Sequence, residues 1–326
     1  MSQRRVGLWL IGAYGGVSST AALGLSALSR KLTDTTSLVT ATPMFAGLDL
    51  DDFGSFVIGG HDIRRSSLVE AVRDLHARSN VFHEALIQAC LPDLEKWSAN
   101  VRPGTVFGAG STISKLADMP EVQRVNTPRE AVERVQGDLR AFKERNKLDQ
   151  LVVVNISSTE PPRDLDARYD TIANFRAALD KPAGEPIPAS ALYAWATIEL
   201  GVPYVNFTPS LGASFPAAID LAEERKTSVC GKDGKTGETL MKTVLAPMFA
   251  HRNFKVLSWV GHNIFGNRDG VVLDDPANKA AKIHTKDKVI SSIVGYKPQT
   301  HVSIEYIESL DDWKTAWDHI HFQGFL

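Results

Sequence analysis

Short apolar runs that alternate with amphipathic helical segments constrain the fold of this 326-residue chain more than any other feature. The runs at 6–11, 151–156 and 202–206 are bounded by glycine or polar residues and are too short for helices, so they predict buried strands. Helical apolar spacing is found at 128–147 and 189–200. Strands that alternate with helices form parallel sheets. The first part of the chain therefore predicts an α/β fold with a doubly wound parallel sheet.

The pattern changes near residue 240. An apolar strand is predicted at 254–262, an alternating strand at 301–307 and a short helix at 311–319. This is α+β in character, so we expect one domain at 1–240 and a smaller one at 241–326. The alternation at 301–307 predicts a sheet with one buried face, and the other face is left for internal helices or for another subunit.

A glycine-rich turn follows the first predicted strand and enters a helix. Gly12, Gly15 and Gly16 allow a ligand close to the backbone, and Ser18 to Thr20 place hydroxyls near the helix N-terminus. Free amides there would hold a pyrophosphate. The spacing is similar to GxGxxG without matching it, which favours a Rossmann-like nucleotide domain. The alternative is simple packing of a strand against a helix.

Polar residues also end the other predicted strands, at the edge where open α/β sheets bind ligands. Asp62 could accept hydrogen bonds from a ribose, although it fits a helix N-cap equally well. It lies later than the usual offset of about twenty residues, so an insertion must intervene. The predicted cofactor-binding residues are Gly12, Tyr14, Gly15, Gly16, Val17, Asp62, Ser157, Ser158, Thr159, Asn206 and Thr208.

Two glycine-bounded polar loops, 231–237 and 266–270, precede a cluster of lysines. Loop amides and ammonium groups suit an anionic ligand. Lys282 and Lys286 are four residues apart and share a face if 276–294 is helical, where their charges repel unless an anion lies between them. The cluster therefore predicts a site for a phosphorylated substrate. The alternative is a pair of surface turns followed by a solvated basic helix.

Composition narrows the possible partners and the compartment. The chain has 36 Lys plus Arg against 38 Asp plus Glu, so a broad basic surface for nucleic acid is not expected. Cys90 and Cys230 lie far apart without metal-site spacing, which fits a reducing compartment and a cytoplasmic protein. The run at 6–11 is too short for a signal peptide or a membrane span. The histidines near the end of the chain have no acidic third ligand at suitable spacing, so no metal is expected.

Taken together, these motifs resemble the inositol-3-phosphate synthase (myo-inositol-1-phosphate synthase) family. Their order and spacing agree over nearly the whole chain. The motifs in the second half are specific. The matching segments are 12–16, 60–63, 155–160, 201–206, 231–239, 262–270, 282–286 and 311–314.

The resemblance implies conversion of D-glucose 6-phosphate to 1D-myo-inositol 3-phosphate with a tightly held NAD. In that reaction C5 is oxidised, C6 loses a proton, the enolate attacks the C1 aldehyde, and the ketone is reduced again. Each step creates charge on oxygen, which ammonium groups can stabilise. Carried over to this sequence, the catalytic residues are Asp233, Asp269, Lys282, Lys286, Asp312 and Lys314, and the substrate-binding residues are Lys235, Thr236 and Asn267.

The resemblance further implies a homotetramer assembled through the sheet of 241–326. The turn at 12–16 differs from the Gly-Gly-Asn-Asn-Gly of eukaryotic members, which is typical of a divergent prokaryotic branch. In the family a further segment, with another acidic residue and another lysine, follows the position of Leu326. The chain is then either a fragment or a branch that dispenses with that segment. Two alternative functions are an NAD-dependent sugar-phosphate or polyol-phosphate dehydrogenase and a non-catalytic homologue.

Overall fold

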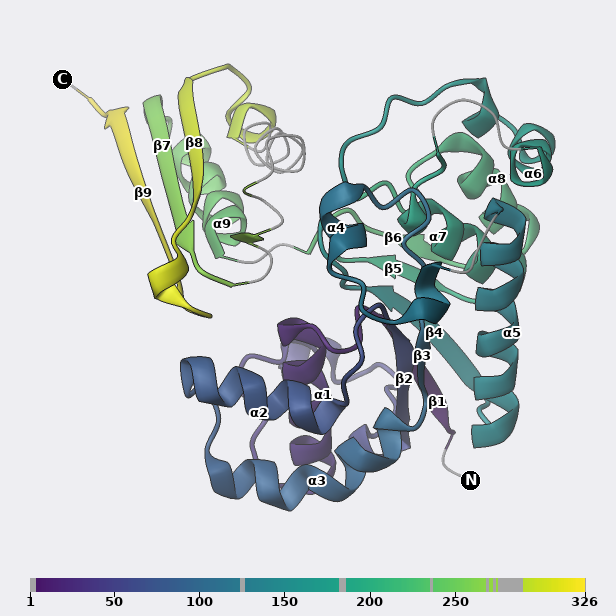
Figure 1. Cartoon of the computed structure of the whole chain (residues 1–326). Helices are drawn as coiled ribbons and strands as arrows, with labels where there is room; N and C mark the ends of the chain where they lie inside the picture. Colours follow the sequence, from purple (N-terminus) through teal and green to yellow (C-terminus); the bar gives the residue numbers. More distant parts are fainter. Residues whose placement is uncertain are drawn as a thin grey trace. The chain divides into compact units, whose positions relative to one another are not determined.

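The computed structural model of the chain describes residues 4–123, 127–181, 186–234, 237–267, 270–271, 274 and 290–325. The chain forms two compact units, each with its own sheet (Figure 1). The first comprises 1–157, 165–207 and 211–231, and the second comprises 158–164, 208–210 and 232–326. The boundary expected at residue 240 falls inside helix α9 (Gly237–His251), which lies wholly within the second unit.

The first unit is built on a six-stranded parallel sheet in the order β3-β2-β1-β4-β5-β6. This order runs outward in both directions from the central β1–β4 pair, as in doubly wound folds, and confirms the predicted α/β class. Both neighbours of β1 pair along its whole length, which explains why that strand is continuously apolar. The strands are β1 (Val6–Ile11), β2 (Phe56–Asp62), β3 (Val101–Pro103), β4 (Gln150–Asn155), β5 (Tyr204–Asn206) and β6 (Val229–Cys230).

Helices cover both faces of this sheet, with α1, α2 and α3 on one side and α5 and α7 on the other (Figure 1). Helix α7 is apolar all round because α5 and α8 pack against it, and its Trp195 is fully buried. Thr127 caps α5 by accepting a hydrogen bond from the Glu130 amide. The helices are α1 (Gly16–Ser29), α2 (Leu68–Ser79), α3 (Glu84–Ser98), α4 (Ser111–Lys115), α5 (Pro128–Asn146), α6 (Ile172–Asp180), α7 (Ala189–Glu199) and α8 (Pro216–Glu224). None of the helices in the described part of the chain is long and apolar enough to cross a membrane.

The second unit contains a three-stranded sheet in the order β8-β7-β9. Its central strand β7 (Lys255–Phe265) is parallel to β8 (Gln299–Tyr306) and antiparallel to β9 (Lys314–Gln323). The helix expected at 311–319 is therefore wrong. Pairing from Lys255 to Phe265 satisfies the backbone of both strands along nearly their whole length, which outweighs a weak local preference for helix.

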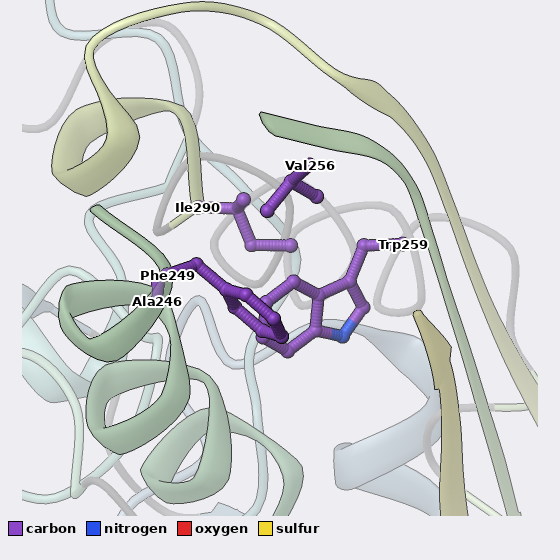
Figure 2. Packing of buried hydrophobic residues seen from close by; sticks show 5 residues of the cluster. All are labelled: Ala246, Phe249, Val256, Trp259 and Ile290. Carbon is purple, nitrogen blue, oxygen red and sulfur yellow. The ribbon is translucent and has the colours of Figure 1, made fainter. Parts of the chain in front are cut away.

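Helix α9 covers one face of this small sheet. Figure 2 shows Phe249 and Ala246 of α9 meeting Val256 and Trp259 of β7 and Ile290 in one buried cluster. The rings of Phe249 and Trp259 meet edge to face, with their centroids 6.0 Å apart. This packing fixes α9 antiparallel to β7, so the first turn of α9 lies at the carboxyl end of β7.

Candidate functional site

The turn between β1 and α1 closes tightly on itself. Gly12 has a φ of +84°, and a Cβ at this position would lie 3.0 Å from the Cα of Ser157. The amides of Gly12 and Ala13 both donate to the carbonyl of His61, at 2.9 and 3.0 Å. A Cβ on Gly15 would lie 3.2 Å from the carbonyl oxygen of Gly12. Glycine at position 12 is therefore what lets the chain turn here, and glycine at position 15 leaves the space beside the Gly12 carbonyl open.

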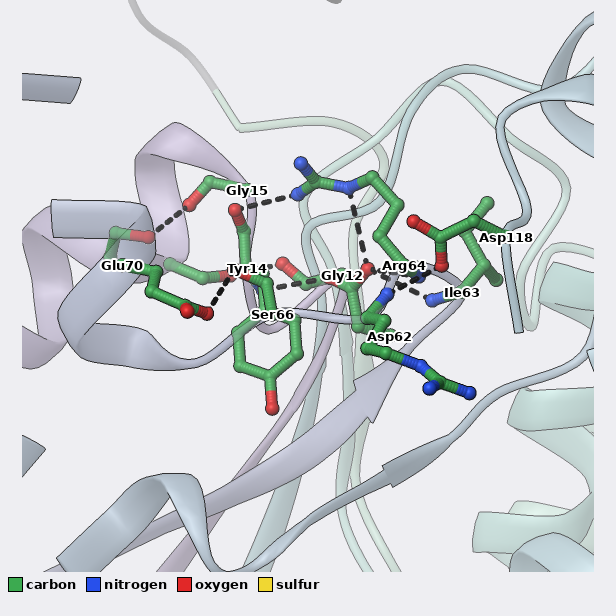
Figure 3. Close-up of polar contacts among 12 residues, drawn as sticks. Gly12, Tyr14, Gly15, Asp62, Ile63, Arg64, Ser66, Glu70 and Asp118 are labelled. Carbon is green, nitrogen blue, oxygen red and sulfur yellow. Dashed lines mark hydrogen bonds and ion pairs between the residues drawn. The ribbon is translucent and has the colours of Figure 1, made fainter. Parts of the chain in front are cut away.

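Asp62, at the end of β2, holds this turn in place (Figure 3). One carboxylate oxygen accepts the amide of Tyr14 at 2.7 Å, and the other accepts the amides of Ile63 and Arg64, each at 2.9 Å. The side chain is buried, and its oxygens already serve three backbone donors. Burial, together with the nearby charge of Asp62, raises the pKa of Tyr14 to about 12. The contact between Asp62 and a ribose stays a prediction.

The hydroxyls of the first turn of α1 point back into the helix. Ser18 donates to the Gly12 carbonyl at 2.8 Å, Ser19 to the Gly15 carbonyl at 2.9 Å, and Thr20 to the Gly16 carbonyl at 2.8 Å. These hydroxyls lie near the helix N-terminus, as expected, and are bonded to the carbonyls of the turn. The amides of residues 16–18 have no acceptor within the helix, and such amides at a helix N-terminus are suited to an anion. A close glycine turn with open amides fits the pyrophosphate of a dinucleotide.

Asn155 and Asn206 join the exits of β4 and β5. The Asn155 amide donates to Asn206 Oδ1 at 3.2 Å, while Asn155 Oδ1 accepts the Ser157 hydroxyl at 2.7 Å. Both asparagines are buried, and a Cβ on Gly231 would lie 2.5 Å from the Asn206 carbonyl oxygen. Asn206 therefore supports the strand exits. Ser158, Thr159 and Thr208 belong to the second unit.

Three segments of the predicted substrate site meet at one end of the small sheet. Lys314 pairs with Phe265 across β9 and β7, and its Nζ lies 5.4 Å from the centroid of the Phe265 ring. A Cβ on Gly237 would lie 3.8 Å from the same Nζ. A Cβ on Gly266 would lie 2.6 Å from the backbone nitrogen of Asp311. Loops far apart in the sequence thus converge where α9 begins and β7 ends.

Four of the residues predicted to act on the substrate lie within the described ranges. The Asn267 side chain accepts the Gly270 amide at 2.9 Å, which closes the loop after β7. Asp312 lies two residues before Lys314, the first residue of β9, and Asp233 lies in the segment that leads to α9. The remaining predicted residues, together with most of the helix expected at 276–294, lie outside the described residues: Lys235, Thr236, Asp269, Lys282 and Lys286.

A buried charged group beside this end of the sheet was missed by the sequence reasoning. Lys242 and Asn263 donate to different oxygens of the Glu238 carboxylate. All three side chains are buried, and Lys242 is fully excluded from solvent. Gly261 leaves the space that the carboxylate occupies. The spacing of four residues between Glu238 and Lys242 on a helix was the available signal. This group fixes the start of α9 to β7.

Comparison with known proteins decides the family. A model for the NAD-binding domain of myo-inositol-1-phosphate synthase matches residues 6–276, and a second model with the same description matches residues 237–326. The chain belongs to the myo-inositol-1-phosphate synthase family. The resemblance seen in the motifs is therefore confirmed, and NAD is the cofactor of this family's nucleotide domain.

Individual members of the synthase family align over most of this chain. The inositol-3-phosphate synthase 1 of Bacteroides thetaiotaomicron is 30% identical over 343 residues, covering 99% of this chain and 77% of that protein. The enzyme of Dictyostelium discoideum is 32% identical over 281 residues, covering 83% of this chain and 53% of its own length. The chain thus spans about half of such longer relatives.

Solved structures of synthase-family proteins share the fold. The inositol-3-phosphate synthase of Caenorhabditis elegans superposes with a TM-score of 0.86 at 24% identity, covering 100% of this chain and 69% of that one. A myo-inositol-1-phosphate synthase-related protein of Thermotoga maritima gives 0.76 at 24% identity, with coverages of 99% and 79%. These likenesses support the architecture of both units.

Proposed function

We propose that this chain catalyses the NAD-dependent cyclisation of D-glucose 6-phosphate to 1D-myo-inositol 3-phosphate. The observation that carries the proposal is the convergence of Gly237, Gly266 and the segment 311–314 at one end of the small sheet, in a chain whose two parts both match the synthase family. Bound NAD supplies a hydride acceptor that returns the hydride later in the same turnover, so no net oxidation occurs.

The chain's own groups bind the substrate and balance its charge. The ammonium of Lys314, held at the start of β9 beside the Phe265 ring, can neutralise a phosphate or an oxyanion of the substrate. Asn267 shapes the loop that faces the same end of the sheet. Lys282 and Lys286 are proposed to share the charge-balancing work, with Lys235 and Thr236 binding substrate. Asp233, Asp269 and Asp312 are proposed to orient the lysines.

The open face of the small sheet supports the proposed homotetramer. The α9-covered face carries Trp259, whereas Trp317 of β9, which is 48% exposed, pairs with His262 on the opposite face. An exposed aromatic side chain on a sheet face that no described helix covers is typical of a subunit interface. The cytoplasmic location is likewise proposed, and it rests on two cysteines that are both free, Cys90 and Cys230.

The experiment is product identification with the purified chain, glucose 6-phosphate and NAD. We expect the phosphorus NMR signal of inositol 3-phosphate to grow without a rise in NADH absorbance. NADH that accumulates in proportion to the product would identify a dehydrogenase instead. Binding of both ligands without any turnover would identify a non-catalytic homologue.

A further inference from the structure

The nucleotide turn carries a cation that no motif predicted. Arg64 lies two residues beyond β2, and its Nη2 donates to the carbonyl of Tyr14 at 2.7 Å. This bond places the guanidinium over the turn between β1 and α1, next to Gly15 (Figure 3). The side chain is 22% exposed, so it is held by the protein and still open to a ligand.

Within the described part of the chain, the Arg64 guanidinium still has N–H donors to offer a ligand. Its Nε lies 3.5 Å from Asp62 Oδ1, and Nη2 is bonded to Tyr14, whereas a guanidinium has five N–H groups. Two other carboxylates lie in this region, and both have partners. Glu70 accepts the Ser66 hydroxyl at 3.4 Å, and Asp118 accepts the Arg65 amide at 2.6 Å. Asp62 is buried and shared among three backbone amides.

We infer that Arg64 is a further cofactor-binding residue, whose guanidinium contacts the pyrophosphate of NAD. The inference rests on the proposed use of NAD by this chain. In this fold the pyrophosphate lies on the amides that begin the helix after β1. Those amides belong to residues 16–18, directly after the Tyr14 carbonyl that Arg64 holds. The planar fork of a guanidinium matches phosphate oxygens, and the end of β2 thus presents a cation to the cofactor.

Calorimetric titration of the full chain tests this contact with three probes: NAD⁺, ADP-ribose and adenosine. In Arg64→Met we expect affinity for NAD⁺ and ADP-ribose to fall by roughly tenfold to a hundredfold, the value of one hydrogen bond to a charged group. Adenosine, which has no phosphate, should bind the variant as it binds wild type. Arg64→Lys should recover part of the loss. Arg65→Met, a change to the exposed neighbour, is the matched control and should bind all three probes normally.

Three outcomes would overturn the inference. The first is an NAD⁺ affinity of Arg64→Met within about twofold of wild type. The second is an equal loss of adenosine binding, which would mean that Arg64 only supports the turn. The third is a loss confined to NADP⁺ in a parallel titration, which would place the guanidinium at a ribose 2′-phosphate. A wild-type chain that fails to bind NAD⁺ at all would refute the proposed cofactor together with this inference, whereas the first three outcomes leave the proposed function standing.

Discussion

At the scale of single residues, His61 shows how the core supports the nucleotide turn. Its carbonyl holds the amides of Gly12 and Ala13, and its ring is fixed from both sides. The indole of Trp9 donates to Nδ1 at 2.9 Å, and Nε2 lies 3.0 Å from Asp138 Oδ2. An indole N–H can only donate, so Nδ1 must accept and the proton resides on Nε2.

The buried His61 ring leads to a prediction about how the free energy of unfolding depends on pH. Burial lowers the pKa of His61, against the opposing effect of Asp138, so the folded chain binds its proton at a lower pH than the unfolded chain does. The free energy of unfolding should therefore be constant above about pH 6.5 and fall below it, by up to about 1.4 kcal/mol per pH unit from this residue. His61→Gln should flatten that fall. Urea unfolding at about pH 7.5 and 5.5 measures it, and identical pH dependence in both proteins would contradict the assignment.

Gly15 gives a second prediction at this scale. Its φ of −71° suits any residue, so Gly15→Val should fold, but the new side chain would press on the Gly12 carbonyl and cover the open amides of α1. We expect NAD⁺ affinity to fall by at least roughly tenfold. Gly24→Ala in the same helix, where a Cβ meets nothing within 4 Å, is the control. Unchanged NAD⁺ binding by a folded Gly15→Val protein would remove the turn from the cofactor site.

At the scale of secondary-structure elements, the buried pair of Glu238 and Lys242 on α9 leads to a prediction about stability. Lys242→Ala would leave the Glu238 carboxylate buried without its cation, which costs about 3–5 kcal/mol of unfolding free energy. The double variant Glu238→Gln with Lys242→Met should recover much of that loss, because it removes both charges together. Thr243→Ala removes an exposed hydroxyl bond to the Leu240 carbonyl from a partly buried position of the same helix, and should change stability by less than about 0.5 kcal/mol. Chemical denaturation of wild type and these three variants gives the comparison, and a double variant no more stable than Lys242→Ala would argue against a coupled pair.

The secondary-structure elements also show which features could be predicted from the sequence and which could not. The strands β1 and β4 are enclosed by helices on both faces, so their apolar runs identify them without any partner being known. β9 is an edge strand whose first four residues are all exposed, so its sequence carries no burial signal and looked helical. Gly231 and Gly237 could be recognised as turn positions because glycine marks a backbone requirement, and both have a positive φ. Arg64 was not found, because its role depends on a contact with Tyr14 of a distant element. Lys242 was not found although Glu238 lies four residues before it, because the sequence does not show that this pair is buried against β7.

At the scale of the whole molecule, each unit carries a different part of the proposed chemistry. Lys314→Ala should therefore lower kcat by roughly 10²–10³ while NAD⁺ affinity stays near that of wild type, because the lysine lies in the second unit and the nucleotide turn in the first. Lys297→Ala, an exposed lysine of the second unit, should leave both values unchanged. Steady-state kinetics and titration with NAD⁺ separate the effects. Normal turnover by Lys314→Ala would exclude this lysine from the reaction.

The chain enters the second unit three times, as 158–164, as 208–210 and finally from 232 onward. The two early visits are short extensions of the exits of β4 and β5, and the Glu160 amide of one donates to the Ser210 hydroxyl of the other at 3.0 Å. No single cut in the gene can therefore separate the two units, since a fragment that starts at residue 232 lacks both strips. Recombination or domain grafting that cuts the chain once would leave the second unit without 158–164 and 208–210, and would leave these two segments attached to the first unit. The two units therefore have to be inherited together.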